Sequence, residues 1–282
     1  MRAVSIRLAV CAAGFAVAPG ATSLATAAFT DFTNWSLVED PPNALFSGSA
    51  TPGSATFFAG DGGVPVGTDI GYQSVNGLSP GSSTAGYAFD PSMSFTIAID
   101  YAITFTGNPE GYLSLGFGVG EDGDGMNSAG MAMTTFDGAP FLVYGAGARV
   151  NDVDQPALPL ALASAASGSL FVSYDAATGD VELGASTMQG AANPEASGTY
   201  AGLQDQWAGT ELLASFFIRS GPIEPWSGGG AAEAAFSNLR ILEGEAKFIP
   251  GPGVVSVMML AMMAGSSRRR RGRSPALATL RQ

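Results

Sequence analysis

The stretch Ser94-Phe-Thr-Ile-Ala-Ile-Asp-Tyr-Ala-Ile-Thr-Phe105 alternates large apolar residues with small or polar ones over its whole length. Side chains point to opposite faces of a strand at every step, so this period of two predicts a β-strand with one buried face. The turn-forming residues 106–111 follow, and Leu113–Val119 then alternates again. Two alternating runs joined by a Gly/Pro-rich turn predict a β-hairpin.

Short apolar runs separated by turn residues continue along the chain on both sides of this hairpin. Leu212–Arg219 is apolar on both faces, which is typical of a strand inside a sandwich. Leu158–Ala166 permits a short helix or a loop, and Gly228–Gly230 is typical of a loop. Many short strands at regular spacing predict a single all-β, antiparallel sandwich domain over residues 28–247. The other candidate strands are 55–59, 87–90, 130–135, 141–144, 170–174, 181–185 and 235–242.

Two short segments of this body resemble concanavalin-like and laminin-G-like sandwiches. Ser169–Leu183 contains a Tyr-Asp…Thr-Gly hairpin, and Phe236–Leu242 is similar to the last strand of those folds. The resemblance implies a jelly roll made of two curved antiparallel sheets. It implies no ligand, because this fold serves lectins, enzymes and spacers alike.

Charge and composition exclude several classes of function. The body from Asp31 to Lys247 carries all 24 acidic residues and only four basic ones, Arg149, Arg219, Arg240 and Lys247, a net charge of −20. Such a surface repels phosphate backbones, so nucleic acid is not an expected partner. The chain has no histidine, and Cys11 precedes the body. Ser-His-Asp triads, Cys-His dyads and His-ligated zinc are therefore excluded.

The N-terminus has the layout of a secretory signal peptide. Arg2 and Arg7 precede the apolar run Leu8–Val17, and Ala25-Thr26-Ala27 is a small-x-small cleavage site. This pattern predicts a signal helix over residues 1–27, removed by signal peptidase after Ala27.

The C-terminal segment, residues 248–282, has features of a second targeting signal. Ile249-Pro250-Gly251-Pro252-Gly253 precedes about a dozen apolar residues and the cluster Arg268, Arg269, Arg270 and Arg271. The arginines should stay on the cytoplasmic side of the membrane, and a short single-pass anchor is one interpretation. The tail also resembles the PEP-CTERM sorting signal in its Ile-Pro-x-Pro-Gly variant. Gly251 stands where that family has glutamate, and 11 residues follow Arg271.

The resemblance of the tail implies a bacterium that makes exopolysaccharide. It also implies an exosortase-like membrane protease that cuts near the Pro-x-Pro element. The expected location is therefore the inner membrane for the precursor, and then the cell surface or extracellular matrix.

Two candidate ligand sites stand out in the body. Asp122, Asp124 and Asn127 supply oxygen atoms on a glycine-rich loop, as calcium requires, although Met126 breaks the EF-hand spacing. The pair Asp152 and Asp154 is a weaker candidate, and a solvated turn that binds no metal is the alternative interpretation. Trp226, between Pro225 and Ser227, is the best candidate for stacking on a sugar.

The sequence therefore predicts an exported, non-enzymatic module associated with exopolysaccharide or matrix glycan. Two alternatives remain. One is a purely structural surface protein, which a concave sheet face of Ala, Ser and Gly would favour, whereas a concave face lined with aromatic residues would favour binding. The other is a glycosidase that uses carboxylates alone, which needs two carboxyl groups about 5–10 Å apart.

Overall fold

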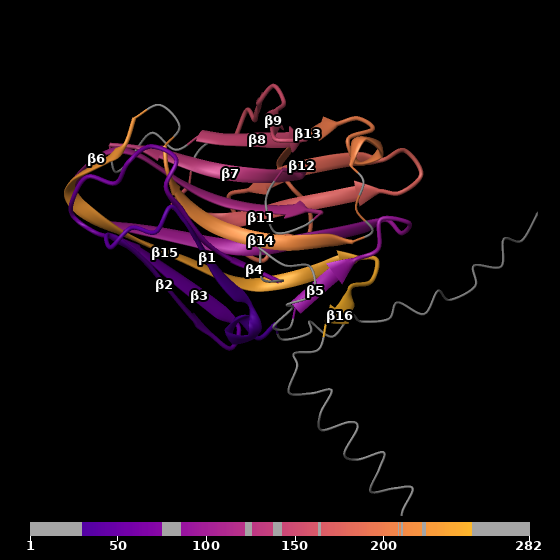
Figure 1. Cartoon of the computed structure of the whole chain (residues 1–282), viewed down its shortest axis with the longest axis horizontal. Helices are drawn as coiled ribbons and strands as arrows, with labels where there is room; N and C mark the ends of the chain where they lie inside the picture. The colour runs from indigo at the N-terminus through magenta and orange to yellow at the C-terminus, as the bar shows by residue number, and fades with distance from the viewer. Residues whose placement is uncertain are drawn as a thin grey trace, which may run out of the picture.

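The computed structural model describes residues 30–74, 86–121, 126–137, 143–162, 165–207, 209, 211–221 and 224–249. These residues form an antiparallel β-sandwich with two single-turn 3-10 helices, η1 (Phe32–Asn34) and η2 (Gln204–Gln206) (Figure 1). Within the described ranges, no helical segment has the length and hydropathy of a membrane span.

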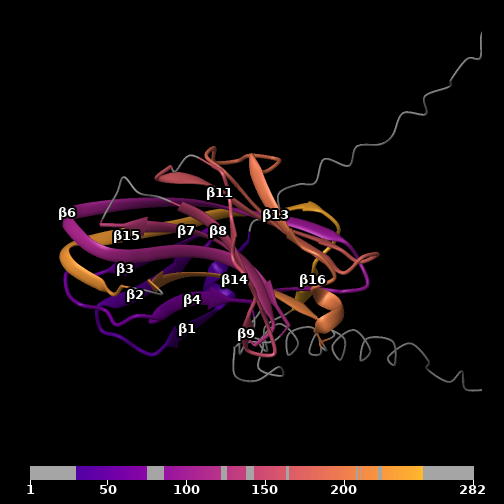
Figure 2. The same ribbon diagram turned by 90° about the horizontal axis from the view of Figure 1, so that it is seen from above.

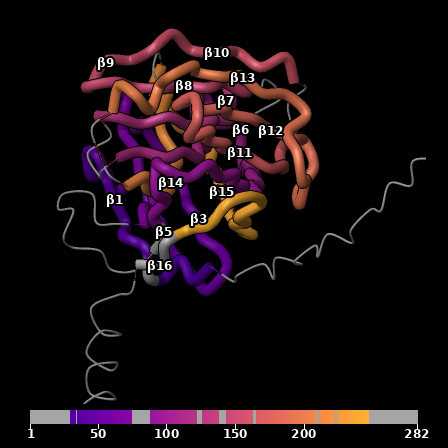
Figure 3. The backbone as a smooth tube through the Cα atoms, turned by 90° about the vertical axis from the view of Figure 1, so that its right-hand side faces the viewer, coloured from indigo at the N-terminus to yellow at the C-terminus, as the bar shows by residue number. Residues whose placement is uncertain are grey.

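One layer, which we call sheet I, has the strand order β1-β4-β14-β6-β7-β8, and short strands extend its margins. β5 and β16 continue from β14, while β9 and β10 pair with β8 at the opposite end of the molecule (Figure 3). Its strands are β1 (Ser36–Asp40), β4 (Asp69–Gln73), β5 (Gly86–Phe89), β7 (Ser128–Phe136), β8 (Val143–Val150), β9 (Val153–Asp154), β10 (Leu158–Pro159), β14 (Leu212–Ser220) and β16 (Lys247–Ile249).

The other layer, sheet II, has the order β2-β3-β15-β6-β11-β12-β13. Its strands are β2 (Phe46–Thr51), β3 (Ser54–Ala59), β11 (Ser167–Asp175), β12 (Asp180–Ser186), β13 (Ala196–Tyr200) and β15 (Trp226–Glu243).

The predicted hairpin at residues 94–119 is wrong in one respect. Its two halves form a single strand, β6 (Phe95–Gly120), whose first half lies in sheet II and whose second half lies in sheet I. Residues 106–111 carry the strand round from one layer to the other without forming a hairpin turn, because they stay paired with β15 through register shifts (Figure 2). Gly107 and Gly111 have φ of 75° and 85°, so the turn residues of the sequence form a bend.

Gly228–Gly230 also differs from its prediction, because these residues lie inside β15 opposite the bend of β6. Of the helix-permissive stretch 158–166, Leu158 and Pro159 form β10, and no helix occurs in its described residues. The other predicted strands are confirmed with shifted ends. The sequence missed the short strands β1, β2, β4, β9, β10, β13 and β16.

The core lies between the inner faces of the two sheets. Phe216 of sheet I and Phe236 of sheet II are fully buried, with ring centroids 5.0 Å apart. Tyr101 of sheet II and Tyr144 of sheet I share a buried hydroxyl–hydroxyl hydrogen bond, and burial raises the pKa of both phenols. The Tyr101 hydroxyl also lies 3.1 Å from the Ala165 carbonyl oxygen, so this polar contact between the two layers is satisfied inside the core.

Candidate functional site

The outer face of sheet I is almost bare of side chains on three adjacent strands. On β6, β7 and β8 every second residue is buried against the core, so the alternate, outward residues define this face. Two cross-strand rows there consist of glycine and one alanine, and we call them the glycine floor. Its members are Gly116, Ala132 and Gly145 in one row and Gly118, Gly130 and Gly147 in the next.

Phe217 of β14 borders the glycine floor. It is the cross-strand partner of Gly116, and its ring leans over that residue, because a Cβ built on Gly116 would lie 2.2 Å from Phe217 Cζ. The ring is partly exposed. Beyond it, Cβ atoms built on Gly145 and Gly147 meet nothing within 4 Å. One aromatic ring therefore lies beside open sheet backbone.

Three charged residues occupy the cross-strand row next to that of Phe217. Asp40, Asp69 and Arg219 are cross-strand neighbours on β1, β4 and β14, and Arg219 Nε lies 3.8 Å from Asp69 Oδ2. Burial raises the pKa of Asp69 to about 6; Arg219 opposes this shift and the charge of Asp40 adds to it. Asp69 could not be identified from the sequence, because β4 was not predicted. Arg219 could have been found from its position two residues after Phe217.

A second charged group lies at the far corner of this face. Arg149, at the end of β8, forms ion pairs with Asp152 at 2.7 Å and with Asp154 at 3.0 Å. Both carboxylates of the candidate calcium pair, Asp152 and Asp154, therefore contact an arginine in this structure. Within the described ranges, no cluster of three metal-ligating side chains occurs.

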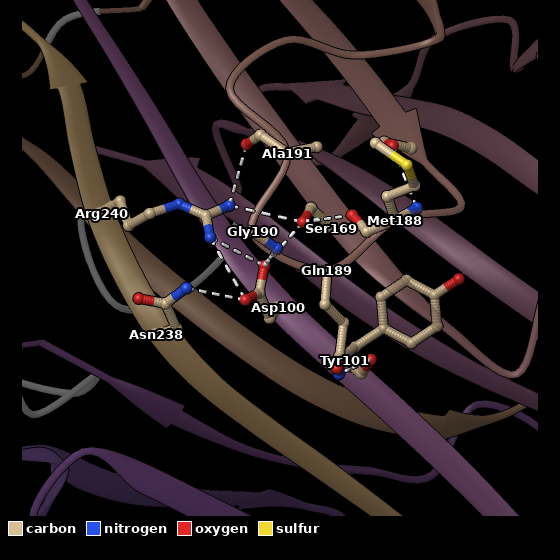
Figure 4. A network of polar contacts seen from close by, with 10 residues as sticks. Asp100, Tyr101, Ser169, Met188, Gln189, Gly190, Ala191, Asn238 and Arg240 are labelled. Atoms are coloured by element: carbon tan, nitrogen blue, oxygen red, sulfur yellow. Dashed lines mark hydrogen bonds and ion pairs between the residues drawn. The ribbon is translucent and has the colours of Figure 1, made fainter.

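The outer face of sheet II carries a buried polar network around Asp100 of β6 (Figure 4). Arg240 Nη1 lies 3.0 Å from Asp100 Oδ1, and Asn238 Nδ2 donates to Asp100 Oδ2 at 2.8 Å. Ser169 Oγ donates to Asp100 Oδ1 at 2.6 Å, and the Gly190 amide donates to the same oxygen at 3.0 Å. Both oxygens of the Asp100 carboxylate are thus occupied by protein donors, and of the Arg240 guanidinium only the buried Nε has no partner.

This network fastens the 187–195 loop onto the sheet. Arg240 Nη2 donates to the Ala191 carbonyl, and Gln189 Nε2 donates to the Tyr101 carbonyl. At the other end of the loop, the backbone and side chain of Thr187 donate to Glu195 and lower the pKa of that carboxyl. The loop is therefore a structural cover for this part of sheet II.

Trp226 is not an exposed sugar-binding residue, contrary to the prediction from its loop-like neighbours. It is the first residue of β15 and is fully buried, with Nε1 donating to the Gly60 carbonyl at 2.9 Å. The extension of β15 through Gly228–Gly230 draws this tryptophan into the sandwich. Trp35 and Trp207 are buried as well.

The first calcium candidate is described only in part. Asp122 and Asp124 lie outside the described residues. Asn127 Nδ2 donates to Glu121 Oε2 at 2.8 Å, and its Oδ1 accepts from the Asn151 amide at 2.7 Å. The Asn127 amide thus holds two neighbouring loops together.

The predicted signal peptide and the predicted C-terminal sorting signal also fall mostly outside the described residues. Ala27, Pro250, Gly251, Pro252, Gly253 and Arg268–Arg271 are not described. Ile249 is the last residue of β16, and its backbone pairs with Gly86 of β5. The folded body therefore extends to the residue before the Pro-Gly-Pro element.

No family model matches this sequence, and no curated protein matches it. Solved structures similar in fold include an alginate lyase from Pseudomonas aeruginosa, with 15% identity and a TM-score of 0.44 over 75% of this chain and 99% of that one. A β-glucanase of Bacillus licheniformis has 10% identity and a TM-score of 0.44, covering 75% of this chain and 94% of that one.

A legume lectin-like domain from Entamoeba histolytica has 9% identity and a TM-score of 0.42, over 72% of this chain and 88% of that one. These likenesses concern the fold alone. The strand pairing itself confirms the predicted all-β antiparallel sandwich. The closer assignment to a concanavalin-like jelly roll stays a prediction.

Proposed function

We propose that the chain is an exported, non-enzymatic β-sandwich of the bacterial cell envelope that associates with matrix glycan through the outer face of sheet I. The observation that carries the glycan part is the partly exposed ring of Phe217 beside the glycine floor. An aromatic face stacks on the apolar face of a sugar ring, and flat backbone beside it lets an extended polymer approach closely.

Export and envelope location rest on the sequence of the two ends. A signal peptide ending at Ala27 and a PEP-CTERM-like tail from Ile249 to Arg271 would deliver the body outside the cytoplasm. Signal peptidase and an exosortase-like protease are the partners that this route requires. The strongly acidic body agrees with a surface that stays solvated in a polysaccharide matrix.

The non-enzymatic assignment is supported by the side chains that border the glycine floor. The outward residues of β6, β7 and β8 around the glycine floor are Ser114, Thr134 and Val143 in one flanking row and Ser128 and Arg149 in the other. None of these is a carboxylic acid that could protonate or attack a glycosidic bond. The cross-strand carboxylates Asp40 and Asp69 lie on the other side of Phe217, on β1 and β4, where Asp69 faces Arg219.

A purely structural role is the second candidate function. It is favoured by the Gly, Ala and Ser residues of the same face and by the burial of all three tryptophans. In that case the sandwich would serve as an acidic display or spacer module.

Affinity electrophoresis separates the two candidates. The full chain, kept in mild non-ionic detergent, is run through native gels with and without dissolved polysaccharides. We expect retardation by at least one polymer and its loss in Phe217→Ala. Phe58→Ala is the matched control, because Phe58 is an exposed phenylalanine on sheet II. If a broad panel of polymers leaves the wild-type mobility unchanged, the glycan proposal fails and the structural role is favoured.

A further inference from the structure

The charges around Phe217 specify the class of glycan that this face can take, an inference that rests on the proposed function. Arg219 is the cation nearest to Phe217 along β14. It shares its row with Asp69, 3.8 Å away, and with Asp40 beyond it. Two carboxylates therefore accompany one guanidinium, and this end of the face carries an excess of negative charge at neutral pH.

At the opposite corner of the outer face of sheet I, two carboxylates again accompany one guanidinium. Arg149 contacts both Asp152 and Asp154. The remaining arginine of the body, Arg240, lies on the other sheet and is committed to Asp100. Each arginine side chain in the described part of the body thus already has a carboxylate partner.

We infer that the outer face of sheet I takes a neutral polysaccharide rather than a uronate or other anionic polymer. An anionic chain bound along the glycine floor would lie between two groups of net negative charge, on a body whose net charge is −20. Like-charge placement costs affinity, and the two arginines described on this face, Arg149 and Arg219, already share their charge with carboxylates. Stacking on Phe217 needs no charge on the sugar.

The inference predicts a distinct salt response. Stacking and hydrogen bonding to a neutral polymer are insensitive to screening, whereas attraction between charges weakens as the Debye length falls from about 20 Å to about 7 Å between 20 and 200 mM salt. We expect the apparent Kd for a neutral polymer to change less than about twofold over this range.

The test uses full-length chain in affinity gels that contain hydroxyethylcellulose or glucomannan as neutral polymers and alginate or polygalacturonate as anionic ones. We expect an apparent Kd at least about tenfold lower for a neutral polymer than for either polyuronate. The variant Asp40→Asn/Asp69→Asn, which frees Arg219, should gain alginate retardation by about threefold or more and keep its neutral binding. The control Glu182→Gln/Glu233→Gln removes the same charge from sheet II and should gain none.

Two results would overturn the inference. Equal or tighter binding of wild type to a polyuronate would contradict it while leaving glycan association intact. An equal gain of alginate binding by both double variants would show that total charge, not the group around Arg219, sets the preference. Retardation by no polymer of either kind would instead remove the proposed function itself.

Discussion

Asp100 and Arg240 are 140 positions apart in the sequence, yet they form a largely buried ion pair, 3.0 Å long, on the outer face of sheet II. The pair lies under the 187–195 loop, whose Gly190 amide and Ala191 carbonyl complete its hydrogen bonds. β6, β15 and this loop thus meet at one carboxylate. A buried charge that loses its partner is costly, so the pair should contribute strongly to stability.

Replacing Arg240 with methionine tests this contribution. The variant leaves Asp100 with amide and hydroxyl donors but without a cation, and we expect the free energy of unfolding to fall by about 3 kcal/mol. Arg149→Met is the matched control, because Arg149 is 40% exposed and its loss should cost at most about 1 kcal/mol. Urea denaturation of both variants measures the difference. Equal losses would contradict the structural role given to the buried pair.

Gly118 and Gly147 lie in the same cross-strand row of sheet I but differ in the space around them. A Cβ on Gly118 would lie 2.5 Å from the Ala129 carbonyl oxygen, whereas one on Gly147 meets nothing within 4 Å. We therefore expect Gly118→Ala to lower the free energy of unfolding by about 1–3 kcal/mol through strain. Gly147→Ala should change it by less than about 1 kcal/mol, in the stabilising direction.

Thermal melts of Gly118→Ala and Gly147→Ala measure this difference in stability. A bulky substitution at the open position, Gly147→Trp, should retain the wild-type melting temperature and yet weaken any polymer retardation, because it covers part of the glycine floor, three strands from Phe217. Wild-type retardation in that variant would place the glycan elsewhere on the molecule.

The fold could be predicted largely from local patterns. Alternation in Ser94–Phe105 and Leu113–Val119 identified strand positions and their buried faces correctly, because one face of each run packs into the core. What those patterns could not distinguish is a turn from a bend, since both use Gly and Pro. The path of residues 106–111 depends on pairing with β15, more than 100 residues away.

The candidate site was beyond the reach of the sequence for a similar reason. The glycine floor arises only when β6, β7 and β8 are set in register, and Gly116, Ala132 and Gly145 are each unremarkable in their own strand. Trp226 was wrongly predicted to stack on a sugar, because its neighbours Pro225 and Ser227 are typical of an exposed loop. The long strand that buries it is held by tertiary pairing rather than by local propensity.

Asp69 should give the protein a measurable pH dependence of stability. Its pKa is raised from 3.8 to about 6 in the folded chain, so between these values the folded state binds more protons than the unfolded state. Stability from this group therefore falls as the pH rises through that window, and the cost of ionising Asp69 is fully present above it. Asp69→Asn should be more stable than wild type at pH 7.5 by about 1–2 kcal/mol, a difference that disappears below about pH 4.

Denaturation curves between pH 3.5 and 8 measure this difference. Asp40→Asn serves as the companion variant, because the charge of Asp40 raises the pKa of Asp69. It should give a smaller stabilisation at pH 7.5, since burial is the main cause of the shift and remains in place. A constant difference between Asp69→Asn and wild type across the whole range would show that Asp69 ionises normally in the fold.

Substitutions of Trp226 and Phe217 should have different effects, the first on stability and the second on polymer binding. Trp226 has no exposed surface, and it fixes the 60–64 segment through two contacts: its indole donates to the Gly60 carbonyl at 2.9 Å, and its own carbonyl accepts from the Val64 amide at 2.7 Å. Trp226→Phe removes the first contact and leaves the buried Gly60 carbonyl unpaired. We expect the free energy of unfolding to fall by about 1–3 kcal/mol.

The same variant should leave polymer retardation unchanged under conditions where it remains folded, because Trp226 lies in the interior and not on either outer face. Phe217→Ala should do the opposite, losing retardation with only a modest loss of stability, since its ring is partly exposed and lies on the surface of sheet I. Urea denaturation and affinity electrophoresis on both variants measure the two effects. Loss of retardation in folded Trp226→Phe, with Phe217→Ala still retarded, would move the binding surface to the β15 side of the sandwich.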